Sequence, residues 1–188
     1  MKRALTTLCA IFCVLFFAQT ANASDFTKIT TNQKLTSALN ALEKIGENEV
    51  ISVLNGNNTT HNPIRIMFRD LSIYGYETSE ALTLRTNSGN LVIFISTKHM
   101  TSPAEAIASL IAHESVHQAQ TGTLEEEVQA WTVEARTWKK FNEYNATLSL
   151  ENTKLTKRLN YIAELYSKDG SSSIHNIVAN IPAYAGLK

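Results

Sequence analysis

The chain has 188 residues, in which 17 lysines and arginines are balanced by 17 aspartates and glutamates. A near-neutral chain without a run of basic residues argues against a nucleic acid as its partner. Its two cysteines, Cys9 and Cys13, both lie near the amino terminus. The rest of the chain therefore cannot form disulfides, and its stability must come from packing and from any bound metal.

The amino-terminal residues have the pattern of an export signal. Two basic residues precede an apolar run, Leu8–Phe17, and Ala21 and Ala23 then supply the small residues that signal peptidase requires. We predict that residues 1–23 are a signal peptide and that 24–188 form a single exported domain, periplasmic or secreted. The apolar run is too short to cross a bilayer, so no membrane span is expected after cleavage. An uncleaved amino-terminal anchor is the alternative.

In the first half of the remaining chain, apolar spacing predicts helices and then a small sheet. An amphipathic helix is expected over 32–46 and a second, short helix over 49–54, before a loop rich in asparagine. After Pro63 the sequence changes to extended, β-branched runs, and the last two runs are joined as a hairpin. The strands are expected over 64–68, 82–86 and 91–96.

In the second half, capping signals predict helices. Ser102, followed by a proline, is the expected N-cap of the first, and Thr123 is the N-cap of the second. Gly170 is expected to break the chain after the third helix. The three helices are expected over 103–120, 124–144 and 151–168. Together these elements predict an α+β fold, with a short, mainly antiparallel sheet packed on a mostly helical body.

His113, Glu114 and His117 form a His-Glu-x-x-His motif inside the first of these predicted helices. Positions i and i+4 of a helix lie on one face, so the two imidazoles can bind one zinc ion with the glutamate beside them. Zinc activates a water molecule and polarises a carbonyl group, while the carboxylate of Glu114 takes the proton of that water. The motif predicts one zinc ion per chain and a metallopeptidase acting on a peptide or protein substrate.

A catalytic zinc normally has a third protein ligand, which the next predicted helix can supply. At ~100° per residue, Glu127 lies on the same face as Trp131 and the other apolar residues that face the core. Glu125 and Glu126 are expected to point toward solvent. A buried carboxylate is costly unless it is paired or bound to a metal. Glu127 is therefore the first candidate for the ligand, and Glu134 is the second.

With these motifs the chain resembles the gluzincin metallopeptidases, in which a Glu ligand on a following helix joins the His-Glu-x-x-His motif. Glu127-Val128-Gln129-Ala130 matches the Glu-x-x-Ala pattern of many gluzincins, and 91–139 resembles their minimal core. The chain is especially similar to small, uncharacterised bacterial proteins of this class. The resemblance implies His113, His117 and Glu127 as zinc ligands and Glu114 as general acid and base.

One position departs from the thermolysin-like pattern, in which an acidic residue one turn after the ligand Glu orients a histidine. That position is Trp131 here, so this supporting role is either missing or moved to Glu134. The resemblance also implies a Tyr or His that stabilises the oxyanion. The sequence does not choose among Tyr144, Tyr161, Tyr166, Tyr184 and His175.

Two other classes of function stay open. A zinc-binding envelope or secreted interaction module could keep the fold without catalysis, although such a protein would be expected to lose the middle Glu, and Glu114 is present. A purely structural exported helical domain would bind no metal. The metal content of the purified protein separates the second class from the other two.

Overall fold

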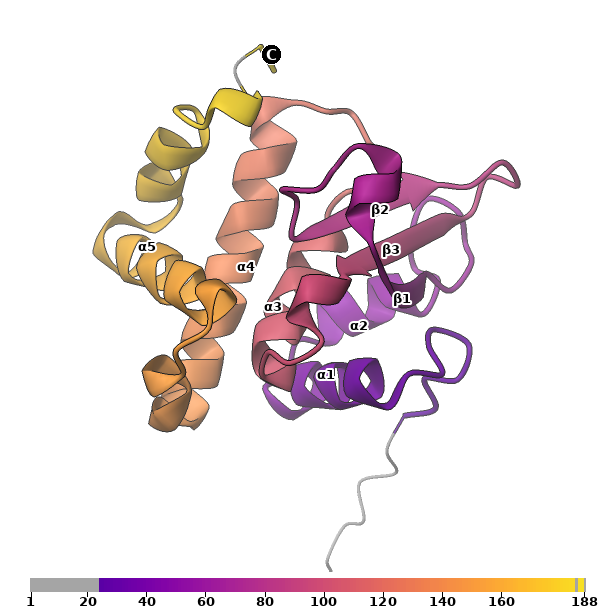
Figure 1. Cartoon of the computed structure of the whole chain (residues 1–188), viewed down its shortest axis with the longest axis horizontal. Coiled ribbons are helices and arrows are strands. Elements are labelled where there is room, and N and C mark those ends of the chain that lie inside the picture. Colours follow the sequence, from indigo (N-terminus) through magenta and orange to yellow (C-terminus); the bar gives the residue numbers. More distant parts are fainter. Residues whose placement is uncertain (1–23, 185, 188) are drawn as a thin grey trace, which may run out of the picture.

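The computed structural model describes residues 24–184, 186 and 187 (Figure 1). The predicted signal peptide and its cleavage site lie outside the described residues. None of the described helices is long and apolar enough to cross a membrane. The main elements are α1 (Gln33–Lys44), α2 (Asn48–Leu54), β1 (Arg65–Arg69), β2 (Ala81–Arg85), β3 (Leu91–Ser96), α3 (Ala104–Glu114), α4 (Leu124–Tyr144) and α5 (Lys154–Val178).

The first helices form where their capping and apolar spacing predict them. The side chain of Asn32 accepts hydrogen bonds from the N–H groups at the start of α1, and Gly46 follows the helix with a φ of 74°. The buried face of α1 is apolar, and its side chains enter the core: Leu35, Ala38, Leu39 and Leu42. The predicted helices over 32–46 and 49–54 are confirmed within the usual variation of helix ends.

The sheet has the strand order β1-β3-β2, so β2 is an edge strand. β2 and β3 form the expected antiparallel hairpin, whereas β1 pairs with β3 in parallel. The sheet is therefore mixed, with one parallel and one antiparallel pair of strands, and is not mainly antiparallel as predicted, because the chain passes through β2 before it returns as β3 between the other two strands. All six residues of β3 are buried. The face away from the helices is covered by a short 3-10 helix, Leu71–Tyr74, whose Leu71 packs with Val92 and Phe94.

Helix α3 lies at the centre of the molecule, between the sheet on one side and α4 with α5 on the other (Figure 1). Every residue from Ala106 to Glu114 is buried, so α3 has no solvent face. The helix begins after Pro103 without a side-chain cap, so the prediction of Ser102 as N-cap is wrong. The predicted α+β fold, a short sheet on a mostly helical body, is confirmed.

Helix α5 continues past the predicted break. Asp169 and Gly170 have non-helical backbone angles, and Gly170 adopts φ 57° and ψ −138°. The helix resumes after this kink and runs to Val178, which is buried together with Ile174. The predicted break is confirmed, but a second helical segment follows it, because the two apolar side chains anchor the segment to the core.

Candidate metal centre

Helix α3 ends at Glu114, earlier than the predicted end at Gln120, so His117 lies on the turn that follows. The N–H of His117 donates to the carbonyl of Glu114 (3.2 Å), a tighter turn than an α-helix makes. Gln120 adopts a positive φ of 53°, which redirects the chain toward α4. The two imidazoles remain neighbours, with ring centroids 5.2 Å apart. The motif thus keeps its geometry although half of it lies outside the helix.

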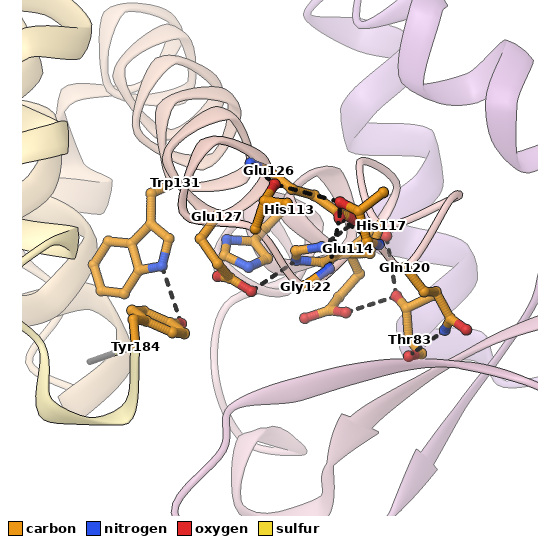
Figure 2. Close-up of polar contacts among 12 residues, drawn as sticks. Thr83, His113, Glu114, His117, Gln120, Gly122, Glu126, Glu127, Trp131 and Tyr184 are labelled. Carbon is orange, nitrogen blue, oxygen red and sulfur yellow. Dashed lines mark hydrogen bonds and ion pairs between the residues drawn. The ribbon is translucent and has the colours of Figure 1, made fainter. Parts of the chain in front are cut away.

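The structure brings His113, His117 and Glu127 together (Figure 2). One nitrogen or oxygen atom from each lies within 4.8 Å of the others. His117 Nε2 is 3.8 Å from Glu127 Oε1, and Glu127 Oε2 is buried without a hydrogen-bond partner. A buried carboxylate oxygen without a partner is costly, and a bound cation would satisfy it. The donor set of two imidazoles and one carboxylate is that of a catalytic zinc site.

Glu134 lies beside His113, so the supporting role that the sequence leaves either missing or moved to Glu134 has a residue in position for it. Its Oε2 is 3.2 Å from His113 Nδ1, so that Nε2 is the ring nitrogen left for a metal. Glu134 is fully buried and also forms an ion pair with Arg158, whose guanidinium lies over the ring of Trp131. Burial raises the pKa of Glu134, but Arg158 and His113 outweigh it and lower the pKa. The carboxylate is therefore ionised and holds the imidazole in place.

Glu126 makes the equivalent contact with the second histidine. Its Oε1 is 3.1 Å from His117 Nδ1, and its Oε2 accepts from the N–H groups of Thr121 (2.8 Å) and Gly122 (3.2 Å). The expectation that Glu126 points to solvent is wrong, whereas Glu125 is exposed as expected. The sequence did contain a signal for this contact, the capping box that begins at Thr123. A Glu at the third helical position of such a box folds back over the preceding loop.

The carboxylate of Glu114 faces the same cleft and is held by the edge strand. Thr83 Oγ is 2.6 Å from Glu114 Oε2 and 3.0 Å from the Glu114 carbonyl oxygen. A hydroxyl group has one proton to donate, and the shorter contact places it on the carboxylate. Both residues are buried. Sequence reasoning missed Thr83, because no local pattern predicts which strand residue meets α3.

Tyr184 lies near the ligands, and Trp131 Nε1 donates to its hydroxyl oxygen (3.4 Å; Figure 2). Burial and the nearby carboxylate of Glu127 raise the pKa of Tyr184 to about 12, so the hydroxyl keeps its proton at neutral pH. The other residues that the sequence left open do not line this cleft. They are Tyr144 and Tyr161, which are exposed, Tyr166, which packs against the core, and His175, which lines a separate cavity.

These residues line a cleft of about 450 Å³. Its walls come from β2 and the segment before it, from the end of α3 and the turn after it, and from α4, and Arg158 and Tyr184 complete the lining. Arg158 is the one lysine or arginine among the described residues of the lining, and carboxylates outnumber it, which favours a bound cation. The carboxylates are those of Glu80, Glu114, Glu126, Glu127 and Glu134.

No family model, curated protein or solved structure matches the chain. The resemblance to gluzincins therefore rests on the motif residues, and the case for a function rests on the geometry of this cleft.

Proposed function

We propose that the protein is an exported zinc-dependent metallopeptidase that hydrolyses peptide bonds. The observation that carries the proposal is the convergence of His113, His117 and Glu127 beside Glu114 in one cleft. Each histidine is oriented through Nδ1 by a carboxylate from α4. Such partners fix the ring and raise its basicity as a ligand. An incidental pair of histidines has no need of two supporting carboxylates, one of which, that of Glu134, is fully buried. Export rests on the sequence of residues 1–23.

The residues of the cleft fit a zinc ion, which His113, His117 and Glu127 would hold. When bound, zinc supplies Lewis acidity that activates a water molecule and polarises the scissile carbonyl. Glu114 is one residue after a ligand and is the base that accepts the proton of the attacking water and returns it to the leaving amine. Thr83 holds one oxygen of this carboxylate, which leaves the other free for the proton.

Tyr184 is the donor best placed to stabilise the negative charge that develops on the carbonyl oxygen. Its hydroxyl keeps a proton at neutral pH, and the indole N–H of Trp131 fixes the position of its oxygen. Preorganised donors of this kind stabilise a transition state without reorganisation at the moment of reaction.

The outer edge of β2, which pairs with no strand among the described residues, favours an extended peptide as the substrate. Across the hairpin, the N–H of Ser96 donates to the carbonyl of Glu80 (3.0 Å). Because backbone groups alternate in direction along a strand, those of Ala81 and Thr83 point to the opposite edge, which borders the cleft. An extended peptide can add to such an edge through main-chain hydrogen bonds. Its scissile bond would then lie beside Glu114.

The test compares zinc-loaded wild type with Glu114→Gln on a peptide library read by mass spectrometry. The variant keeps the shape of the side chain and loses the proton acceptor, so we expect it to retain zinc and to lose at least about a hundredfold in cleavage rate. Glu125→Gln, on the exposed face of α4, is the matched control and should behave as wild type.

Equal cleavage by wild type and Glu114→Gln would contradict the proposal. Zinc binding without cleavage by either protein would favour the alternative, a non-catalytic zinc-binding module that keeps the fold.

A further inference from the structure

The cleft is closed at one end. Of strand β2, the residues Ala81, Leu82 and Thr83 line the cleft, together with the segment before the strand, whereas Leu84 and Arg85 do not. Figure 2 shows Gln120 and Thr83 on one side of the metal ligands, and Trp131 with Tyr184 on the other. The cleft thus runs from the loop after α3 toward Tyr184, and it ends where Gln120 meets β2.

The closing loop is fastened to the strand by several hydrogen bonds. Gln120 Nε2 donates to the carbonyl of Thr83 (2.9 Å), on the free edge of β2. The carbonyl of Gln118 accepts from Arg85 (2.9 Å) and from the hydroxyl of Thr59 (3.0 Å). Farther along, Glu126 binds the backbone N–H groups at 121 and 122. The loop is therefore part of the cleft wall and is anchored at both ends.

This closure limits how a peptide can lie on β2. Thr83 and Arg85 are the edge residues beyond Ala81, and the loop already uses the Thr83 carbonyl and the Arg85 side chain. A peptide that continued past Thr83 would have to displace Gln120. From the point beside Glu114, the substrate can extend freely only toward the segment before β2. On the Gln120 side of the scissile bond, the cleft has room for little more than the end of a peptide chain.

The charge of the cleft indicates which end of a peptide fits there. A free amino terminus is a cation and a free carboxyl terminus is an anion. The closed end is lined by Gln120, Gly122 and Glu126, while Arg85, which fastens the loop, is not part of the lining and donates to the carbonyls of Gly89 and Gln118. Arg158, the cation of the lining, has its terminal nitrogens on Glu134 at the His113 side. The lining as a whole holds five carboxylates against this one cation, so the cleft favours the ammonium group of a chain end over a carboxylate.

We propose that the enzyme is an aminopeptidase, which removes residues from the free amino terminus of peptides that extend out of the open end of the cleft. This inference rests on the proposed function and names its substrate class. The loop at 118–122 restricts the enzyme to chain ends, because it occupies the edge of β2 that an internal stretch of polypeptide would need.

The test uses zinc-loaded protein and one unstructured peptide sequence in three forms: with free ends, with an acetylated amino terminus, and with an amidated carboxyl terminus. Wild type should cleave the free and amidated forms near the amino terminus, and acetylation should reduce cleavage at least about tenfold, since it removes the charge and adds bulk at the closed end. A second readout needs no turnover. Zinc-loaded Glu114→Gln should bind the free form about tenfold more tightly than the acetylated form, as measured by calorimetry.

The double variant Arg85→Ala with Gln120→Gly removes the side chains that fasten the loop, and glycine accepts the positive φ at 120. With zinc retained, this variant should gain cleavage of the acetylated peptide. Gln118→Ala is the matched control, because only its carbonyl takes part in the closure, and it should behave as wild type.

Efficient internal cleavage of the acetylated peptide by wild type, or removal of residues from the carboxyl terminus, would overturn this inference and leave the peptidase intact. If no peptide is cleaved in a Glu114-dependent way, both the proposed function and this inference fail.

Discussion

At the scale of single residues, α4 supplies the carboxylates that surround the two histidines. Glu127 provides an oxygen to the metal group, while Glu126 and Glu134 each hold the Nδ1 atom of one histidine. Their neighbour Glu125 is exposed. Consecutive glutamates at the start of one helix therefore differ in role, and this difference can be measured.

Glu126→Gln should weaken zinc binding by about tenfold to a hundredfold, the usual effect of losing a partner that orients a ligand histidine. The amide can still accept from the loop N–H groups, so the loop is kept while the charge beside His117 is lost. Zinc affinity, measured by competition with a chelator, is the readout. Glu125→Gln is the control, and an equal effect of both substitutions would mean that general charge, not orientation, controls affinity.

Zinc affinity should fall as the pH is lowered. Burial lowers the pKa of His113, but the hydrogen bond and the charge of Glu134 outweigh it, and the net pKa lies above the ordinary value of 6.5. A protonated imidazole cannot bind metal, so binding displaces a proton at any pH below the raised pKa. Affinity should therefore drop by up to about tenfold per pH unit for each displaced proton. A chelator titration from pH 8 to pH 5 checks this, and a flat profile would show that His113 is not a ligand.

At the scale of elements, the sequence predicted the helices and strands well, because apolar spacing and capping residues act locally. It placed the end of α3 too late, since the hydrogen bonds that turn the chain at 115–120 come from Thr59, Thr83 and Arg85, which are distant in sequence. Glu127 was predicted as the candidate ligand from helical phase, but the contacts of Glu126 and Thr83 depend on loop and strand packing. Such contacts do not follow the regular spacing of apolar residues, so they cannot be predicted from the sequence pattern.

The kink in α5 gives a prediction at this scale. Gly170 adopts φ 57° and ψ −138°, a conformation open mainly to glycine. No atom would contact an added methyl group within 4 Å, so the cost of Gly170→Ala is backbone strain alone. The free energy of unfolding should fall by about 1–3 kcal/mol. Chemical denaturation measures it, with exposed Ser172→Ala as the control, and an unchanged stability would show that the kink relaxes.

At the scale of the whole molecule, the fold explains how the candidate metal site can be rigid without disulfides. Residues 24–188 contain no cysteine, so packing must hold the site in place. Helix α3 is buried between the sheet and the α4–α5 pair, so the motif is anchored by the core. The edge strand, α3 with the turn after it, and α4 meet at one cleft. They supply the outer edge of the sheet, the two histidines with Glu114, and the other glutamates. We expect this meeting point to bind zinc.

The most direct test is the zinc content of the purified chain 24–188 after exposure to zinc and removal of excess metal, measured by elemental analysis. The structure predicts about one zinc ion per chain in wild type and almost none in His113→Ala or His117→Ala, because each change removes one of the three protein ligands. Circular dichroism should show that the variants remain folded. Wild type without zinc, or folded variants with as much zinc as wild type, would contradict the account.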